Sequence, residues 1–295
     1  MSLKSRKSLH HLVSFFTRSF ARHEHPTGLV WIVLGASDSA ASYSDLDELV
    51  NETLVPALDR EDGITLLYRL HNTNPSARNG TLRSHFRPTN GGRCALVVKI
   101  ADSRDVDTLK ALSNLPIIIR PGLSLPMYND TEREEAGHKA GIMTSYGAYL
   151  KRYNLVQRFD SHRCPPHAGG TCIVSVAIEP AEGDDEILDR WYRDEHLNLL
   201  AQVPIFIRCT RFKLLSPEQG QVVDKGTPRF LALHEYEGSK ALLDYAIQHG
   251  QIVPETPTSK HILGRAQKIE RTVWDVRERW DGSDAVKFVI SDDDE

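Results

Sequence analysis

Residues 171–215 read TCIVSVAIEPAEGDDEILDRWYRDEHLNLLAQVPIFIRCTRFKLL, and their pattern predicts the unit from which the fold is built. Residues 171–178 are mostly apolar and rich in β-branched side chains, which is typical of a buried strand. Residues 185–202 carry apolar side chains at helical spacing. Residues 206–215 alternate between apolar and polar, as a half-buried strand does. We therefore expect a strand, a helix and a strand in that order.

The same order continues downstream and recurs upstream. After 215, the pattern predicts a strand at 230–236, a short helix at 239–247 with Ser239 as its N-cap, and a strand at 271–277. Upstream, it predicts strands at 28–35, 63–70, 94–100 and 153–159 and helices at 45–58 and 105–115. The first strands and first helices of the two sets match at an offset of about 142–145 residues.

Each set reads β-α-β-β-α-β, the split βαβ plan of ferredoxin-like domains. A sheet of this plan carries its helices on one face, so its other face must be covered by something else. We expect an α+β chain of two ferredoxin-like repeats, residues 27–162 and 171–280, joined by a linker at 163–170. The two repeats would bury their open faces against each other and form an intramolecular dimeric α/β-barrel.

The ends of the chain are expected to lie outside this barrel. Residues 1–26 form a basic leader, in which the first 23 residues contain five basic side chains and no acidic one. This composition fits a transit peptide as well as a disordered cytosolic leader, so both cytoplasmic and mitochondrial locations stay open. Residues 281–295 read as an acidic, solvated tail.

Composition excludes several classes of function. The chain has 295 residues, with 36 basic and 40 acidic side chains and a net charge of −4, which argues against a general nucleic-acid binder. No apolar stretch approaches the ~20 residues that a membrane span needs. The four cysteines form no CxxC pair. A monomer and a homodimer are both compatible with these features.

Four stretches of the second repeat resemble one family. They are WYRDEH at 191–196, LLAQVP at 199–204, RCTRF at 208–212 and FLALHEY at 230–236. Together they resemble fungal EthD-like proteins of the dimeric α/β-barrel superfamily. The resemblance implies small-molecule chemistry, often in secondary metabolism, by cyclases, dehydratases, isomerases or cofactor-free monooxygenases. The first repeat is similar in layout only, with Leu49, Val50, Thr53 and Leu54 in place of the motif.

The candidate site lies between the helix and the sheet of the second repeat. Helical spacing places Tyr192 and His196 on the face toward the sheet, and alternation places His234 on one face of its strand. Arg208 and Arg211 point to opposite faces, so only one of them can reach the cavity. Histidine suits proton transfer near neutral pH, and Tyr or Arg can hold an enolate oxygen. The candidate catalytic residues are His196, His234 and Tyr192, and the candidate substrate-binding residues are Arg211, Trp191, Tyr236 and Phe230.

We therefore expect a lyase-like enzyme, a dehydratase or cyclase, acting without a cofactor on a small hydrophobic, aromatic or polyketide-type metabolite. Two alternatives stay open, a non-catalytic ligand-binding or stress-related barrel and a cofactor-free monooxygenase. On the structural alternative, His196 serves packing and His234 bonds a backbone carbonyl. His162, Cys164, His167 and Cys172 crowd together, but their spacing is not a common zinc pattern, so no metal is expected.

Overall fold

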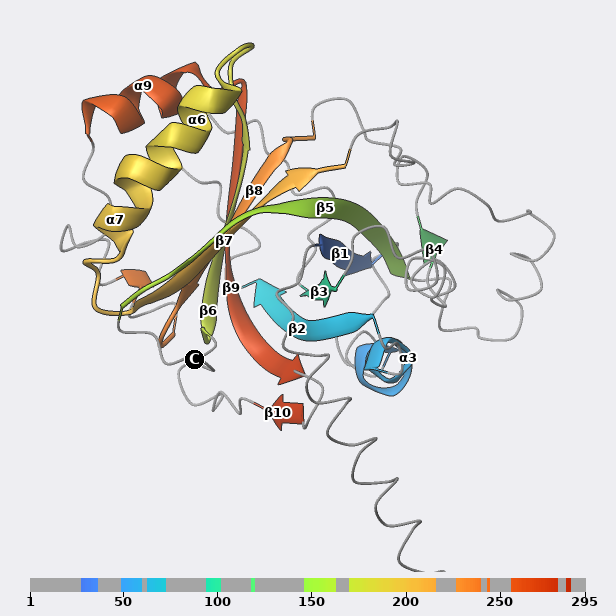
Figure 1. Cartoon of the computed structure of the whole chain (residues 1–295). Coiled ribbons are helices and arrows are strands. Elements are labelled where there is room, and N and C mark those ends of the chain that lie inside the picture. The colour runs from blue at the N-terminus through green and yellow to red at the C-terminus, as the bar shows by residue number, and fades with distance from the viewer. Residues whose placement is uncertain are drawn as a thin grey trace, which may run out of the picture.

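The computed structural model (Figure 1) describes residues 28–36, 49–59, 63–72, 94–101, 118–119, 146–162, 170–215, 227–239, 243–244, 256–280 and 285–287. The predicted helix at 105–115, nearly all of the predicted linker and most of the predicted helix at 239–247 fall outside these residues.

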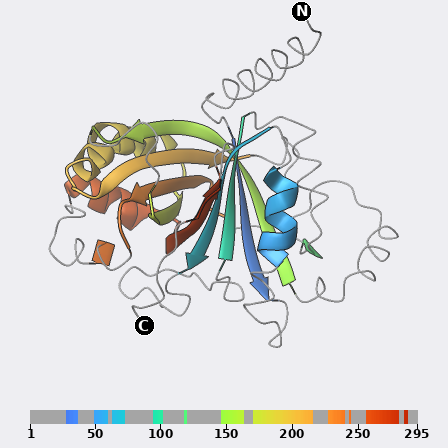
Figure 2. The same cartoon turned by 90° about the horizontal axis from the view of Figure 1, so that it is seen from below.

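Eight antiparallel strands close into a barrel. Their order is β1-β3-β2-β9-β6-β8-β7-β5, and β5 pairs with β1 to complete the ring. In Figure 2 the blue and teal strands lie beside the blue helix on one side of the molecule, and the yellow to red strands lie with their helices on the other. The strands are β1 (Gly28–Ala36), β2 (Ile64–Asn72), β3 (Cys94–Ile100), β5 (Tyr146–Asp160), β6 (Cys172–Glu179), β7 (Phe206–Leu214), β8 (Phe230–Tyr236) and β9 (Lys268–Trp280).

The ring consists of two strand sets that lie edge to edge. We call β1, β2, β3 and β5 the N-terminal strand set, and β6, β7, β8 and β9 the C-terminal strand set. Their orders are β5-β1-β3-β2 and β9-β6-β8-β7, so the last, first, third and second strands follow one another in both. The sets meet at two seams, where β2 pairs with β9 and β5 pairs with β7.

All eight strands contribute to an apolar core inside the barrel. Strand alternation sends every second side chain inward, and these side chains make one buried cluster. Trp31 of β1 meets Trp274 of β9 edge to face, with ring centroids 5.6 Å apart. The cluster consists of Leu29, Trp31, Tyr68, Leu70, Ala95, Val97, Tyr153, Ile173, Ala177, Phe212, Leu214, Leu231, Leu233, Trp274 and Val276.

The outer face of each strand set is covered by helix. A π-helical segment η1 (Leu49–Leu54) and α3 (Val55–Asp59) pack on the N-terminal set, in the same cluster as Val98 of β3. The C-terminal set carries α6 (Asp185–Trp191), a second π-helical segment η3 (Tyr192–His196) and α7 (Leu197–Leu200). A further helix, α9 (Pro257–Arg265), lies beside α6 in Figure 1.

Most predicted elements are present, with three differences. The residues predicted as one regular helix at 185–202 are interrupted by η3, and the π turn buries Leu197 and Leu200 while Leu199 is only half-buried. Helix α9 was not predicted, although Thr256 caps it by accepting from Ser259 N–H and Pro257 begins it. The segment predicted as an acidic tail contains β10 (Ala285–Lys287), which pairs with β9.

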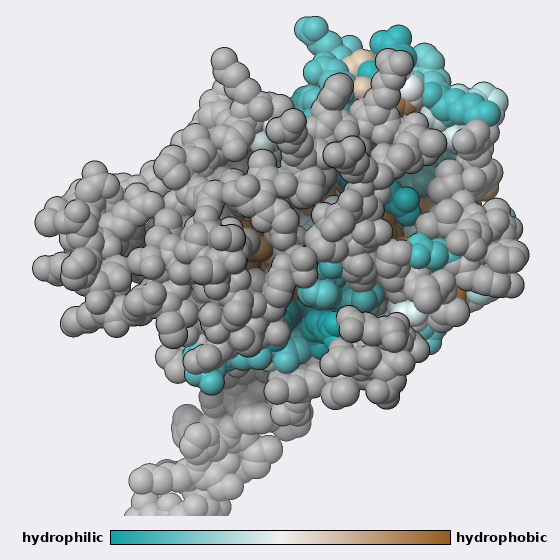
Figure 3. Space-filling model, turned by 180° about the vertical axis from the view of Figure 1, so that it is seen from behind, coloured by the Kyte–Doolittle hydropathy of each residue, from teal (hydrophilic) through white to brown (hydrophobic). Residues whose placement is uncertain are grey.

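The described surface is mostly polar. Among the described residues, the large hydrophobic residue that is exposed to solvent is Ile187, with 39% of its surface accessible. Figure 3 shows the described residues of one face as predominantly hydrophilic. No helix in the described part of the chain is long and apolar enough to cross a membrane.

One ion pair joins the two strand sets inside the barrel. Lys99 Nζ of β3 lies 3.4 Å from Glu235 Oε1 of β8, and both residues are almost completely buried. Tyr68 donates its hydroxyl to Glu235 Oε2, and Arg208 lies 4.0 Å from the same oxygen. Burial alone would raise the pKa of Glu235, but Lys99, Arg208 and the Gly170 N–H hold it below its usual value.

The two members of this pair occupy matching positions. β3 and β8 each have seven residues, and Lys99 and Glu235 are the sixth of each. Their neighbours in the sheet match as well, since Lys99 pairs with Leu29 of the first strand and Glu235 with Ile173 of β6. Matching positions in the two strand sets therefore carry opposite charges that meet inside the barrel.

Gly170 lies directly against this carboxylate. Its N–H donates to Glu235 Oε2 at 3.3 Å. A Cβ at this position would lie 2.8 Å from the Cβ of Glu235 and 2.9 Å from the backbone N and O of Tyr236. Only glycine lets the chain pass this close to the end of β8.

We expect Gly170→Ala to lower the free energy of unfolding by about 2–3 kcal/mol, because the new methyl meets backbone that cannot move aside cheaply. Gly264→Ala in α9 is the matched control: its Cβ meets nothing within 4 Å, and the change should stabilise by about 0.5 kcal/mol through helix propensity. Urea unfolding of both variants measures these free energies. Equal stability of the two variants would contradict the close packing of Gly170 against the end of β8.

Removing one partner of the buried ion pair should be costly. Lys99→Met or Glu235→Leu alone should lower the free energy of unfolding by about 3–5 kcal/mol, because each leaves an uncompensated buried charge. The double variant should recover most of that loss. A double-mutant cycle by urea unfolding measures the coupling, and additive effects would show that the two charges do not depend on each other.

Candidate functional site

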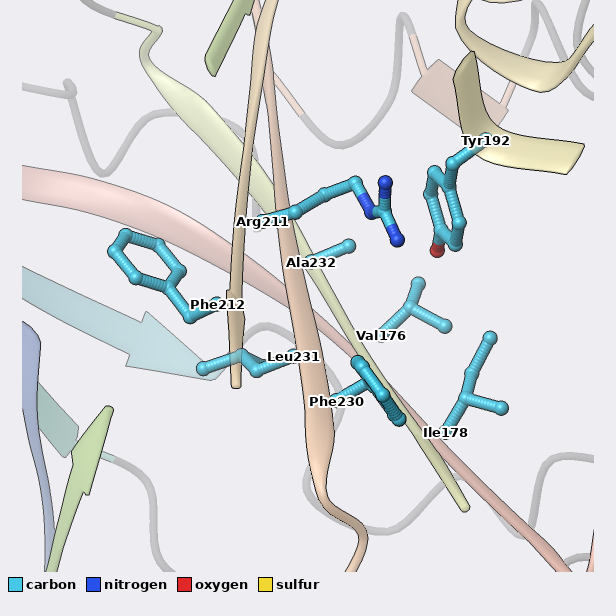
Figure 4. Close-up of a pocket in the computed structure, with 8 residues that line it drawn as sticks. All are labelled: Val176, Ile178, Tyr192, Arg211, Phe212, Phe230, Leu231 and Ala232. Carbon is cyan, nitrogen blue, oxygen red and sulfur yellow. The ribbon is translucent and has the colours of Figure 1, made fainter. Parts of the chain in front are cut away.

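A small pocket lies on the outer face of the C-terminal strand set, beneath the helix that contains η3. It has a volume of about 190 Å³, including its open mouth. Figure 4 shows Arg211 reaching from β7 toward the Tyr192 ring on the helix. The lining residues are Val176, Ile178, Tyr192, Arg211, Phe212, Phe230, Leu231 and Ala232. Two of them, Phe212 and Leu231, point their side chains away from Tyr192 and into the core inside the barrel.

The π-helical segment η3 arranges the aromatic side chains next to the pocket. The Leu197 N–H donates to Tyr192 O, five residues back, as a π turn requires. Residues five apart thus come close on one face of the helix. Trp191 and His196 are five apart, and their rings stack with centroids 4.3 Å apart and planes 25° apart. In a regular α-helix these two side chains would point in different directions.

His196, His234 and Tyr192 form one cluster. The ring centroids of His196 and His234 are 5.8 Å apart, edge to face. Tyr192 lies 5.2 Å from His196 and 6.3 Å from His234, centroid to centroid. The three predicted catalytic side chains are thus in mutual ring contact, two from the helix and one from β8. Of the three, Tyr192 lines the pocket itself, and the histidines lie behind it.

His234 has a fixed tautomer and one unused nitrogen. Its Nδ1 lies 3.3 Å from Val174 O, and a carbonyl oxygen can only accept, so Nδ1 carries the proton of the neutral ring. The lone pair of Nε2 is therefore free, and this buried atom has no hydrogen-bond partner in the structure. The Trp191 ring, which stacks on His196, also has a buried Nε1 donor without a hydrogen-bond partner in the structure. An unmet buried group costs about 1–3 kcal/mol each, which a ligand or water can offset.

Burial keeps both histidines neutral. It lowers the pKa of His196 from its usual 6.5 to about 4, against a smaller raising effect of Glu195. Burial, and then the nearby His196 ring, lower the pKa of His234 to about 3. Burial also raises the pKa of the Tyr192 hydroxyl well above its usual value. At neutral pH the cluster contains two unprotonated bases and no charged acid.

Arg211 supplies the positive charge of the pocket. Its guanidinium carbon lies 4.1 Å from the centroid of the Tyr192 ring, a cation–π distance. Its Nη1 donates to Asp189 Oδ1 of α6 at 2.9 Å and to Gln157 Oε1 of β5 at 2.6 Å. Asp189 also accepts from Arg193, and these two arginines keep its pKa below the usual value despite burial.

The structure separates the other predicted residues. Arg208 lies near Glu235 inside the barrel, whereas Arg211 is among the residues that line the pocket. Phe230 lines the pocket, and Trp191 is a wall behind His196. Tyr236 does not reach the pocket, because it packs on Phe206 with ring centroids 5.6 Å apart. His234 does bond a backbone carbonyl, as the structural alternative expected, yet it keeps a free nitrogen.

Sequence reasoning missed two residues of the site, Asp189 and Gln157. Asp189 lies one helical turn before Arg193 and could have been found as the partner of a buried arginine. Gln157 belongs to β5 of the other strand set. It directly pairs with Arg211 across a seam, and no pattern in the sequence places these strands side by side.

The N-terminal strand set has an apolar version of the same arrangement. Leu54 ends η1 as His196 ends η3, and Val98 is the fifth residue of β3 as His234 is of β8. Leu54, Val98 and Val50 are fully buried in one cluster. The histidine cluster is therefore not needed to build this kind of helix–sheet contact.

The pocket mouth is held by charged groups around Phe230. Arg229 donates to both oxygens of Asp185 at the start of α6 and also to Glu179. Lys213 Nζ and the Arg229 guanidinium lie 5.0 Å and 5.6 Å from the Phe230 ring centroid. Lys213 and Arg229 both pair with Asp185, and neither is among the lining residues, which do include Arg211.

The residues that suggested a metal are only partly described. Cys164 and His167 fall outside the described residues, and Cys172 is a buried free thiol. Within the described ranges, no group of three or more His, Cys, Asp or Glu side chains is arranged to hold a metal ion.

Comparison with solved structures finds one that shares the fold. One titled an anthrone oxidase-like protein superposes with a TM-score of 0.52 at 14% identity, covering 91% of this chain and 98% of its own. The DyP-type peroxidase from Mycobacterium smegmatis gives 0.48 at 10% identity, over 85% and 92% of the two chains. A monooxygenase-like protein from Listeria innocua gives 0.39 at 11%, over 85% and 94%. The first supports a dimeric α/β-barrel fold, here within one chain.

Sequence comparisons add nothing to this. No protein-family model and no curated protein matches the chain.

The histidine cluster should make stability depend on pH. Between about pH 6.5 and pH 4, the unfolded chain binds protons at His196 and His234 that the folded chain does not. The free energy of unfolding should therefore fall as pH is lowered through this window, by up to about 1.4 kcal/mol per pH unit for each histidine.

His196→Leu and His234→Val introduce the residues found at the matching N-terminal positions. Each should flatten the slope, whereas His261→Gln, at an exposed position of α9, should not. Urea unfolding at pH 4.5, 5.5, 6.5 and 7.5 measures the slopes. An unchanged slope in both cluster variants would mean that the histidines titrate normally in the folded protein.

Proposed function

We propose that this pocket is the site of an oxygenase-type enzyme acting on a small carbon acid, an enolisable or phenolic metabolite. The observation that carries the proposal is the buried pair of neutral histidines, with the free Nε2 of His234, next to a pocket that contains Arg211. The fold shared with an anthrone oxidase-like protein agrees with this choice of reaction class.

The low pKa of the histidines limits the substrate. A base whose pKa lies near 4 removes a proton efficiently only from an activated position, since proton transfer follows the difference between the two pKa values. His196 is less buried than His234 and is the group we assign to the substrate proton. Because the pocket lining includes Tyr192 and not His196, this assignment requires the Tyr192 ring to turn aside when the substrate binds. Arg211 then holds the oxygen of the enolate or phenolate that forms.

The same environment disfavours a lyase. Dehydration needs a group that protonates the departing hydroxyl, and a buried neutral histidine pair and a tyrosine of raised pKa are poor acids at neutral pH. The lyase prediction made from the sequence therefore has less physical support than its oxygenase alternative.

Oxygenation needs no external reductant when the substrate supplies all the electrons. His196 takes one proton from a CH2 group, and the resulting carbanion gives an electron to O2 and then forms a carbon–peroxide bond. The proton returns to the peroxide, and loss of water leaves a ketone. The balance is CH2 + O2 → C=O + H2O, with four electrons passing from carbon to oxygen.

The pocket size limits the bound group. The enclosed part of the pocket has room for no more than about one water molecule, so a substrate ring would lie at its open mouth. The apolar lining by Val176, Ile178 and Phe230 favours an uncharged ring before proton removal.

The proposal also covers the repeat architecture of the chain and its family. We infer that the two strand sets are ferredoxin-like repeats, supported by their common strand order and by a π segment in the first helix of each. Membership of the EthD-like group rests on the resemblance of residues 191–236 alone.

We expect oxygen consumption with anthrone, or with the single-ring carbon acid 1,3-cyclohexanedione, at one O2 per ketone formed. His196→Leu should lower kcat/KM at least about 100-fold, the usual contribution of a general base. The exposed His261→Gln should leave it unchanged. Because the neutral ring is the active form, activity should persist down to about pH 4 and be lost below it.

An oxygen electrode and chromatographic analysis of products measure these outcomes. Product formation without oxygen consumption would indicate a lyase instead. Ligand binding by wild-type protein with no turnover of either probe would favour the non-catalytic barrel.

A further inference from the structure

The N-terminal strand set contributes a side chain to the pocket of the C-terminal set. Gln157 lies on β5, and its Oε1 accepts from Arg211 Nη1 at 2.6 Å. Gln157 and Arg211 are direct partners in the seam between β5 and β7, next to a bulge in the pairing between Leu155 and Gln157. The pocket lining comes from the C-terminal set alone, so the N-terminal set acts on the pocket through this contact with Arg211.

The other seam repeats this arrangement without a histidine cluster. β2 and β7 each have nine residues, and Arg69 and Arg211 are the sixth of each. Arg69 Nη1 bonds Asn51 of η1 at 2.6 Å and lies 3.4 Å from Glu278 of β9, its direct partner in the seam. Both seam arginines are thus held by one helix residue and one residue of the opposite strand set.

The two seams differ in the charge of the cross-seam partner. Glu278 is a carboxylate partner of Arg69 across its seam, whereas Gln157 is uncharged. Within the described residues, the carboxylate that offsets Arg211 is Asp189 of α6. The Asp189 side chain is 36% exposed and shared with Arg193, while the Arg211 side chain is 3% exposed. Because Gln157 is uncharged, its hydrogen bond fixes the Arg211 guanidinium without cancelling the positive charge that Arg211 presents to the pocket.

We propose that Gln157 is a positioning residue that holds the Arg211 guanidinium in the pocket as a binding group for an oxygen anion, an enolate or a phenolate. This inference rests on the proposed function for its chemistry, and it adds that the site requires both strand sets. Gln157 itself does not touch the substrate. It acts through the place and direction of Arg211.

4-Nitrophenol is a suitable probe, because it has a single ring and its ionised form absorbs visible light. In the wild-type protein, Arg211 should make the bound phenol ionise more readily than the free one. Gln157→Leu removes the acceptor and should weaken phenolate binding about tenfold, the value of one hydrogen bond to a charged group. Binding of nitrobenzene, a neutral ring of similar shape, should not change.

Asp189→Asn distinguishes positioning from simple loss of structure. It keeps an oxygen acceptor but removes the carboxylate that offsets Arg211, so it should strengthen phenolate binding, opposite in sign to Gln157→Leu. Glu278→Leu is the matched control at the other seam. It should lower the free energy of unfolding as Gln157→Leu does, but it should leave the affinities for 4-nitrophenol and nitrobenzene unchanged.

Spectroscopic titration of bound 4-nitrophenol in the full-length protein measures all four cases. Equal phenolate affinity in wild type and Gln157→Leu, a change of the same sign in Asp189→Asn, or no binding by the wild type would overturn the inference. Absence of oxygen consumption with the probe responses intact would instead remove the proposed reaction and leave the role of Gln157 standing.

Discussion

The Lys99–Glu235 ion pair is the contact on which the arrangement of the two strand sets depends. It lies inside the barrel between the third strands of the two sets, where neither charge reaches water. Two copies of the N-terminal set would place two lysines at this point, and two copies of the C-terminal set would place two glutamates there. Either arrangement leaves buried like charges, so the pair favours association of unlike halves. Gly170 completes the contact and ties the entry to β6 to the same carboxylate.

With the barrel closed in this way, the outer faces are free to differ. Both sets use a π turn in the first helix, but the N-terminal set fills the contact below it with Val50, Leu54 and Val98. The C-terminal set has Tyr192, His196 and His234 at these places. Replacing aliphatic side chains by imidazoles in a buried position lowers their pKa and leaves polar atoms unmet. Such costs are typical of a site selected for binding or chemistry rather than for stability.

The sequence predicts the strands well and the site in part. The spans of β3 and β8 agree with the pattern at both ends, because turn residues bound their apolar runs. The burial of Leu197 in place of Leu199 could not be predicted, since a π turn shifts the buried face without a mark in the periodicity. Helix α9 has few apolar residues, although Thr256 and Pro257 are a recognisable start. The contact between Gln157 and Arg211 could not be predicted, because strand pairing across a seam depends on the whole fold.

Closure of the ring of strands also affects how the protein can associate with other chains. Each of the eight barrel strands has a hydrogen-bonded neighbour on both sides. The two longest strands extend past their neighbours, however, so residues 155–160 of β5 and 268–273 of β9 each pair with a described strand on one side only. The outermost added strands there are β4 (Ile118–Ile119), with two residues, and β10, with three. Edges this short are poor templates for an added strand, so the longer one-sided stretches of β5 and β9 are the places where an extended segment of another chain would meet the sheet.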